Sequence, residues 1–372
     1  MISTSATFPF VALLMLVLAL ATSASPSSSA EVSPTGDISS TSVPPPAVFI
    51  IGAAGAIGSQ LTAHLLMKGI PVVAGLRRSK LPAYLTSHPL LVTELGVDCQ
   101  NAASIERVLA NHPSIETVWN LAAPLSVETS SDPALAYDVV VNGMDRLLKA
   151  MRKHNVPNIC FSDSIGSYGA SAPREGATAR WLVENPTQDP GSDYGVQKRA
   201  CRDLMQAFAS EDSSRSSRFA VIPGVLHDDE RWGAGTTEYA LDAIKAAVAG
   251  TVYDSAVEID VLLPMIMRDD LIDGLYRLTT ASKEKLREVD GGYAIAGFSF
   301  TARSLFSEIA KVAPDFQYVA DAQTLAESPA ALFARLWPDS LSGKEAERDL
   351  GFKAKQSSVE KMVADIYNAH KH

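Results

Sequence analysis

Residues 48–58 read Val-Phe-Ile-Ile-Gly-Ala-Ala-Gly-Ala-Ile-Gly, and leucines follow at positions 61, 65 and 66. The first four residues form a short apolar run bounded by glycine, which is typical of a buried strand. The leucine spacing is that of one face of a helix. The stretch therefore predicts a strand, a glycine-rich turn and a helix in direct succession.

Three glycines, Gly52, Gly55 and Gly58, occupy the predicted turn. Glycines at these positions allow a tight turn, close approach of the backbone to a pyrophosphate, and close packing of the helix against the strand. The backbone amides at the start of the helix, near Ala56 and Ile57, attract phosphate oxygens. These five residues are therefore candidate contacts of a dinucleotide cofactor.

Strand and helix patterns alternate along the chain beyond this turn. The predicted strands are 71–75, 91–95, 117–123 and 158–162, and the predicted helices are 104–110 and 134–154. Such alternation is typical of an α/β fold with a doubly wound parallel sheet. We expect this Rossmann-type part over residues 47–230 and a smaller C-terminal substrate-binding lobe over residues 231–372. Residues 261–280 are expected to return to the Rossmann part, with a strand at Val261–Met265 rejoining its sheet.

The end of the second predicted strand bears on the choice between NAD and NADP. An NAD site usually offers Asp or Glu there to the adenosine ribose, whereas this chain has Leu76, Arg77 and Arg78. Arginine suits a 2′-phosphate, so the sequence slightly favours NADP unless both arginines are ordinary surface charges. Asp98, after the third strand, is a candidate adenine contact.

The strand predicted at 117–123 ends in small residues, where the backbone must pass close to the cofactor. Its candidate contacts are Leu121, Ala122 and Ala123, and Ser126 follows on the next loop.

A tyrosine and a lysine lie four residues apart in Tyr194-Gly-Val-Gln-Lys198. On a helix they share one face, one turn apart, and the ammonium favours the phenolate form of the tyrosine. The phenol can then act as an acid or base toward a carbinol or carbonyl oxygen. Ser164, near the end of a predicted strand, supplies a second hydrogen-bonding hydroxyl. Such a pair also occurs by chance on surface helices, so the preceding glycine turn is what favours a catalytic role.

The composition fits a soluble globular protein, with 372 residues of which 47% are hydrophobic and 20% are charged. The formal net charge of −10 gives no basic footprint for nucleic acid. Cys99, Cys160 and Cys201 are too widely spaced for a metal motif or a disulfide framework. We therefore expect a small-molecule substrate, with neither a nucleic-acid partner nor a bound metal.

Residues 1–46 are not expected to belong to the fold. Residues 8–21 are apolar but fall short of the roughly 20 residues that span a bilayer, and small residues follow them. Residues 1–24 therefore resemble a signal peptide, although no Lys or Arg occurs before Lys68. Residues 25–46 are rich in Ser, Thr and Pro, which predicts a disordered linker. The expected destination is the secretory pathway or a signal-led organelle, with the mitochondrion as the alternative, and no membrane span after signal removal.

The order and spacing of the glycine turn, Ser164, Tyr194 and Lys198 resemble the extended short-chain dehydrogenase/reductase superfamily, which includes the NAD-dependent epimerases and dehydratases. Over about residues 47–368 the chain is similar to the L-threonine 3-dehydrogenase branch. The matching pieces are residues 164–169, 194–198, 223–224, 235–240, 263–265 with 269–270, 298–301, 337–338 and 349–352. The most specific of them is Gly-Thr-Thr-Glu-Tyr-Ala at 235–240.

The resemblance implies an oxidoreductase of threonine catabolism that converts L-threonine to 2-amino-3-oxobutanoate, or that oxidises a related 3-hydroxy acid. Tyr194 would be the general base for oxidation, and Lys198 would favour its phenolate and hold the nicotinamide ribose. Ser164 would hold the substrate oxygen, and Pro223 would contact the cofactor. The other implied substrate contacts are Ser126, Ile165, Gly166, Thr237 and Glu238. Among these, Glu238 would pair with the substrate ammonium unless it is a solvated residue at a helix start. The family pattern is also compatible with a homodimer through the helices that begin near Asp138 and Tyr194.

The sequence departs from the family pattern at several places. Val140 stands where the family has Asn, and Asn142 is displaced from that position by two residues. Asp163 replaces a serine and introduces a charge beside Ser164. The Trp337-Pro338 element lacks its usual preceding Asp. These departures bear on the identity of the substrate more than on the dehydrogenase chemistry.

Two other functions stay open. The chain resembles, at the superfamily level, nucleotide-sugar epimerases and carbonyl reductases, although sugar-nucleotide enzymes usually carry Phe-Asn where this chain has Pro223-Gly224. It could also be a non-catalytic cofactor-binding scaffold, against which the intact Ser164, Tyr194 and Lys198 argue.

Overall fold

The computed structural model describes residues 45–123, 129, 132–185, 188–228, 235–288 and 291–371. The predicted signal-like segment 1–24 and nearly all of the predicted linker 25–46 lie outside these ranges. Within the described ranges, no helix has the length and apolar character that crossing a membrane requires.

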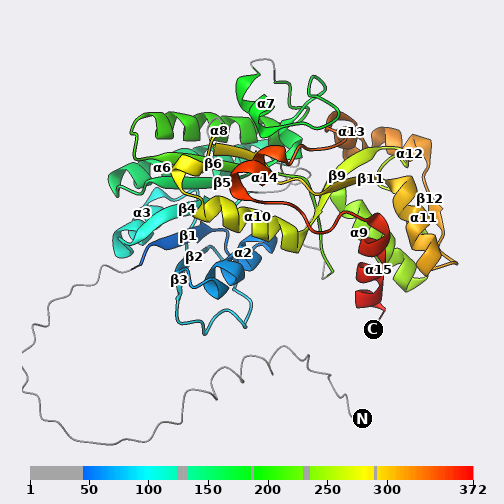
Figure 1. The fold of residues 1–372 in the computed structure, drawn as a ribbon, viewed down its shortest axis with the longest axis horizontal. Coiled ribbons are helices and arrows are strands. Elements are labelled where there is room, and N and C mark those ends of the chain that lie inside the picture. Colours follow the sequence, from blue (N-terminus) through cyan, green and yellow to red (C-terminus); the bar gives the residue numbers. More distant parts are fainter. Residues whose placement is uncertain are drawn as a thin grey trace, which may run out of the picture. The chain divides into compact units, whose positions relative to one another are not determined.

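A seven-stranded sheet forms the centre of the Rossmann part (Figure 1). From one edge to the other it holds β10 (Gly292–Ala294), β6 (Ser216–Ile222), β5 (Asn158–Ser164), β4 (Ile115–Asn120), β1 (Ala47–Ile51), β2 (Val72–Leu76) and β3 (Leu91–Leu95). Each strand pairs in parallel with its neighbours. The predicted doubly wound parallel sheet is therefore confirmed.

Helices cover this sheet on both faces, which is why the central strand β1 and its neighbour β2 are continuous buried runs of small and apolar residues. One layer holds α3 (Ala102–Asn111), α6 (Gly143–Lys153) and α8 (Asp193–Ser210), and the other holds α2 (Ala56–Met67) and α10 (Arg268–Thr280) (Figure 1). Successive side chains of a strand point to opposite faces. Phe49 and Ile51 accordingly pack into the core of the first layer, and Val48 and Ile50 into that of the second.

The helix predicted over 134–154 is interrupted by a π-helical segment. It comprises α5 (Pro133–Tyr137), the π-helical segment η1 (Asp138–Asn142), and α6. A π-helix has more residues per turn than an α-helix. Residues before and after η1 therefore do not share the face that an uninterrupted helix would give them.

A second sheet of three strands follows the first along the chain. It runs in the order β11 (Phe298–Thr301), β9 (Leu262–Met267), β7 (Gly224–Leu226). We expected the strand near Val261–Met265 to rejoin the main sheet, and this prediction is wrong, because β9 pairs with β7 and β11 instead. The strand that returns to the main sheet is β10, beside β6, while α10 does pack on the Rossmann part through Leu271 and Leu275.

The remaining elements belong mostly to the C-terminal half. They are η2 (Ile165–Ser167), α7 (Ala179–Glu184), η3 (Thr236–Glu238), α9 (Tyr239–Ala249), β8 (Tyr253–Asp254), η4 (Lys283–Lys285), α11 (Ala302–Val312), β12 (Tyr318–Val319), α12 (Ala322–Glu327), α13 (Pro329–Leu336), α14 (Lys344–Leu350) and α15 (Val359–His370). Helices α9, α11 and α15 contribute Ile244, Ile309 and Ile366 to one shared core.

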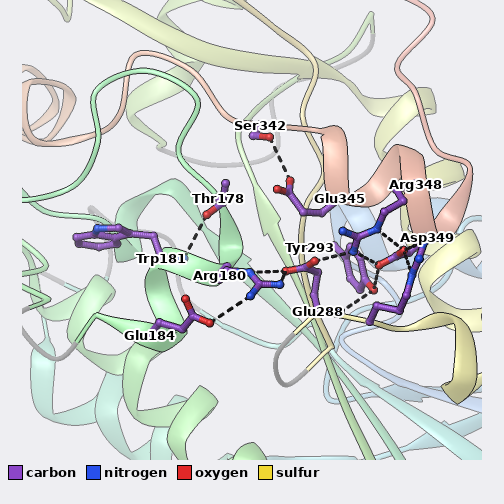
Figure 2. A network of polar contacts seen from close by, with 11 residues as sticks. Thr178, Arg180, Trp181, Glu184, Glu288, Tyr293, Ser342, Glu345, Arg348 and Asp349 are labelled. Carbon is purple, nitrogen blue, oxygen red and sulfur yellow. Dashed lines mark hydrogen bonds and ion pairs between the residues drawn. The ribbon is translucent and has the colours of Figure 1, made fainter.

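Two buried carboxylates, Glu288 and Asp349, join α7, β10 and α14 (Figure 2). The Glu288 carboxylate lies 2.9 Å from Arg180 Nη2 and 2.6 Å from Arg348 Nη2. Asp349 pairs with Arg348, and Tyr293 Oη donates to it at 2.9 Å. The described chain from residue 45 onward lies in one compact unit, and the boundary at residue 231 stays a prediction.

Candidate active site

The turn after β1 leaves the N-terminus of α2 open. Gly52 has a φ of +85°, a left-handed conformation that favours glycine. A Cβ at Gly58 would lie 2.2 Å from the Gly52 carbonyl oxygen, so no larger residue fits there. Helix α2 begins with neither a side-chain cap nor an acidic residue in its first turn. Its first amides are therefore presented to an anion.

This turn lies where the order of the sheet reverses, because β1 pairs with β2 on one side and β4 on the other. Leu121 N donates to the Ile51 carbonyl oxygen at 3.0 Å, so the chain after β4 continues beside the turn. A Cβ at Gly52 would lie 3.0 Å from Ala122 N. Open α/β sheets bind their ligands in this crevice, and the close glycine contacts fit the pyrophosphate of a dinucleotide.

Helix α8 carries Tyr194 in its first turn and Lys198 one turn later. The Ser192 side chain caps the helix by accepting from Gly195 N at 3.2 Å. Lys198 is buried, and its Nζ donates to the Ser162 carbonyl oxygen at 2.6 Å. The same Nζ lies 5.2 Å from the centre of the Tyr194 ring. The ammonium is thus held between the tyrosine and the end of β5.

Ser164 ends β5 and begins the short helical turn η2. Its Oγ accepts a hydrogen bond from Gly166 N at 3.1 Å. A Cβ at Gly166 would lie 3.0 Å from Tyr194 Cδ1. The absence of a side chain at Gly166 therefore lets the tyrosine ring lie against the turn that carries Ser164.

Asp163, the charge introduced beside Ser164, is neutralised in a buried ion pair. Its carboxylate accepts from Ser164 N at 2.8 Å and from Ser167 Oγ, and it pairs with Arg202. The side chains of Asp163 and Arg202 are 0% and 5% exposed. Arg202 lies one turn beyond Lys198, so Tyr194, Lys198 and Arg202 form one stripe of α8 that faces the end of β5.

A cavity of about 370 Å³ extends from the glycine turn to these side chains. The predicted contacts that line it are Gly52, Gly55, Ala56, Ile57, Gly58, Leu121, Ala123, Ser164, Ile165, Tyr194, Lys198, Pro223, Thr237 and Glu238. The cofactor, catalytic and substrate candidates therefore share one cavity.

Several predicted contacts do not line this cavity. Ala122 and Gly166 pack behind it, against Gly52 and Tyr194. Arg77 and Arg78 are exposed after β2, and half-buried Asp98 lies just beyond β3, where its carboxylate accepts from Gln100 N at 3.0 Å. Ser126 lies outside the described residues.

Asn142 does not take the place of the family's asparagine. Its side chain is exposed and donates to Asp138 Oδ1 at 3.0 Å. It does not line the cavity, and Val140 is buried beside α8, where its carbonyl oxygen accepts from Cys201 Sγ at 3.5 Å. The π-helical segment thus presents no asparagine to the site.

Some side chains that line the cavity were not among the predicted site residues, and His227, Arg268 and Trp337 are the largest of them. His227 directly follows β7 and Arg268 directly follows β9. Both residues could in principle have been predicted as site residues, because α/β folds bind their ligands at the carboxyl ends of strands. Trp337 belonged to the family resemblance, and Arg174 fixes it by donating to its carbonyl oxygen at 2.5 Å.

Comparisons with known proteins agree with this geometry. A model of the NAD dependent epimerase/dehydratase family matches residues 48–257. An uncharacterized epimerase/dehydratase of Staphylococcus haemolyticus is 27% identical over 317 residues, which cover 83% of this chain and 92% of that protein.

Two solved structures are similar over most of their length. A partial consensus L-threonine 3-dehydrogenase has a TM-score of 0.76 at 28% identity, covering 88% of this chain and 99% of that one. The holo form of a GalE-like L-threonine dehydrogenase from Cupriavidus necator has a TM-score of 0.76 at 27% identity, covering 87% and 99%. With more than half of its length matched by the family model, and with the glycine turn and the Tyr194–Lys198 pair at one cavity, the chain belongs to the NAD dependent epimerase/dehydratase family.

Proposed function

We propose that the protein is an NAD(P)-dependent dehydrogenase that oxidises the 3-hydroxyl group of L-threonine, or of a closely related 3-hydroxy amino acid, to a 3-oxo product. The observation that carries the proposal is the convergence of Ser164, Tyr194 and Lys198 on the cavity that begins at the glycine turn. Similarity to two L-threonine dehydrogenases over 99% of their length supports the choice of substrate.

The glycine turn and Lys198 would hold the cofactor, which when bound would supply the acceptor for a hydride from the substrate carbon. Tyr194, as phenolate, accepts the hydroxyl proton, so that the alcohol loses one hydride and one proton in total. Lys198 stabilises the phenolate by charge and is held in place by the Ser162 carbonyl oxygen. Ser164 donates a hydrogen bond to the substrate oxygen as it becomes a carbonyl.

Thr237 and Glu238 supply the substrate side of the cavity. Thr237 packs against β7, because a Cβ at Gly224 would lie 2.7 Å from Thr237 Cβ. The next residue, Glu238, is the acidic candidate for pairing with the substrate ammonium, and a charge-assisted pair fixes orientation. Glu238→Gln is therefore expected to weaken 3-hydroxy amino acids and to spare 3-hydroxy acids that lack the amino group.

The choice of NADP over NAD is the finer part of the proposal. Val97 N donates to the Leu76 carbonyl oxygen at 3.0 Å. Arg77 and Asp98, the next residues of the two segments, therefore follow neighbouring strands at the same edge of the sheet. Exposed arginines at this edge suit a 2′-phosphate, and one such pair favours NADP by roughly 10- to 150-fold.

Purified protein tests both parts. Reduced nicotinamide is followed with NAD and with NADP against L-threonine, other 3-hydroxy acids and a nucleotide sugar. Oxidation of L-threonine supports the proposal. Conversion of the nucleotide sugar without net cofactor reduction, or an absence of turnover with every 3-hydroxy acid, rejects it. A tighter dissociation constant for NAD than for NADP would show that Arg77 and Arg78 are surface charges.

A further inference from the structure

Another cavity, of about 100 Å³, is formed between α7, α8 and β6, and we call it the α7–α8 cavity. Among the described residues it shares no lining residue with the catalytic cavity. Its apolar lining comes from Leu182 and Val183 of α7, Met205 of α8 and Phe219 of β6. An enclosed apolar cavity of about 150 Å³ holds benzene. The α7–α8 cavity therefore has room for a molecule of only a few non-hydrogen atoms, part of which projects through its mouth.

The buried ion pair of Asp163 and Arg202 joins the walls of the two cavities. Asp163 lines the catalytic cavity, and Arg202 lines the α7–α8 cavity. Arg202 also donates to Gln188 Oε1 at 2.8 Å. Its charge is thus neutralised by Asp163, which in turn accepts from Ser164 N at 2.8 Å. Arg202 is part of the wall, and an occupant of the α7–α8 cavity would lie one ion pair away from Ser164.

The other two charged side chains of this lining, Arg199 and Asp203, are opposite in sign and one turn apart on α8. Within the described part of the chain, neither forms an ion pair with the other or with a third residue. Arg199 is half-buried, and its Nη1 donates to the Gln188 carbonyl oxygen at 3.3 Å. That contact uses one of five N–H donors and leaves the positive charge without a carboxylate. Asp203 is exposed, which places the negative charge at the mouth of the cavity.

We propose that the α7–α8 cavity is a second ligand site, which binds a small aliphatic α-amino acid as its zwitterion. The carboxylate pairs with Arg199, because a guanidinium matches a carboxylate with two parallel N–H donors. The ammonium pairs with Asp203 at the mouth, and the short side chain lies against the apolar lining. The inference goes beyond the proposed function and does not depend on it, since this site lies outside the catalytic cavity.

Calorimetric titration of the purified protein compares L-alanine with propionate, which lacks the ammonium, and with ethylamine, which lacks the carboxylate. We expect saturable binding of L-alanine and weaker binding of the other two. Arg199→Gln should raise the dissociation constants of L-alanine and propionate by roughly 10- to 150-fold. Asp203→Asn should raise that of L-alanine by up to about fivefold, because exposed pairs contribute less, and should leave that of propionate unchanged. Arg303→Gln is the matched control, since it removes one positive charge at a side chain that is 55% exposed, and it should alter none of the three.

Three results would overturn the proposal. The first is an absence of saturable L-alanine binding by the wild type. The second is L-alanine binding that Arg199→Gln leaves unchanged, which would place the ligand elsewhere, as in the catalytic cavity. The third is equal affinity for L-alanine and propionate with no effect of Asp203→Asn, which would show a site for carboxylates rather than for zwitterions. None of these measurements involves turnover, so each of them leaves the proposed dehydrogenase activity untouched.

Discussion

The buried pair of Asp163 and Arg202 makes a quantitative prediction about stability. Asp163→Asn keeps the shape of the side chain but removes its charge, and it leaves Arg202 as a positive charge in a site where its side chain is only 5% exposed. Removing one partner of a buried ion pair typically costs about 3–5 kcal/mol, because the other charge stays buried without compensation. The substituted side chain also replaces one of its acceptor oxygens by a donor. We therefore expect a loss of about 3–5 kcal/mol in the free energy of unfolding.

Urea unfolding followed by tryptophan fluorescence measures this loss as a shift of the midpoint. Asp260→Asn serves as the control, because its pair with Arg303 has side-chain exposures of 73% and 55%. An exposed pair contributes little, so the control midpoint should stay near that of the wild type. The double variant Asp163→Asn with Arg202→Met removes both charges, and it should recover much of the loss.

Two results would refute this reasoning. The first is an Asp163→Asn midpoint no lower than that of Asp260→Asn, which would mean that water or a rearranged partner compensates Arg202. The second is a double variant as unstable as the sum of its single variants, which would show that the two side chains act independently.

Three further predictions concern the site and its supports. Tyr194→Phe should lower kcat by roughly 10²–10⁴-fold with little change in the cofactor dissociation constant, and undiminished turnover would reject the tyrosine as the acid/base. Gly58→Ala should weaken cofactor binding measured by titration, because the alanine Cβ would lie 2.2 Å from the Gly52 carbonyl oxygen and would displace the turn. This loss is expected even though alanine is better than glycine in a helix by about 1 kcal/mol. Wild-type affinity in this variant would show that the glycine turn does not bind the cofactor. Arg348 holds the pKa of the Asp349 carboxyl in the folded protein below its usual range, so the unfolded state binds the proton more readily. The ionised carboxyl therefore stabilises the folded protein above about pH 3.9, and this stabilisation is lost as the pH falls through the folded pKa. Urea midpoints measured from neutral to acidic pH should therefore fall less steeply in Asp349→Asn than in the wild type, and identical slopes would show that this carboxyl is not linked to acid unfolding.

Strands β1 to β5 of the main sheet were predictable because their signals are local, whereas β6 and β10 were not predicted. The run Val48–Ile51 is apolar at every position, since β1 is buried on both faces. Of the glycines that follow, Gly52 has a positive φ and Gly58 has a backbone contact that leaves no room for a Cβ. Tyr194 and Lys198 are one turn apart on a single helix, so their meeting required no knowledge of the remainder of the fold. The conclusions that held were those carried by neighbouring residues.

The features that were missed depend on contacts between distant segments. The sequence shows that β9 is a strand, but its partners β7 and β11 are a property of the folded chain. Strand β10 has three residues, which is too short to show a period. The pairing of Asp163 with Arg202 was within reach, because Arg202 follows Lys198 by four residues on the same face of α8. That His227 and Arg268 follow neighbouring strands could not be seen until the pairing of β7 with β9 was known.

Strand β10 and helix α10 are encoded late in the sequence, and this position has a consequence for the synthesis of the chain. Strand β6 ends at Ile222 and its neighbour β10 begins at Gly292, so about 70 residues separate them, which take roughly 4–14 s to translate at about 5–20 residues per second. During part of that interval the Trp119 side chain lacks its cover, because its indole donates to Thr279 Oγ1 of α10 at 2.8 Å in the finished fold. We therefore expect the part of this sheet face that α10 covers to stay exposed on the nascent chain for seconds, although α2 already packs on the same face, and a fragment cut after residue 257 would lack that cover permanently.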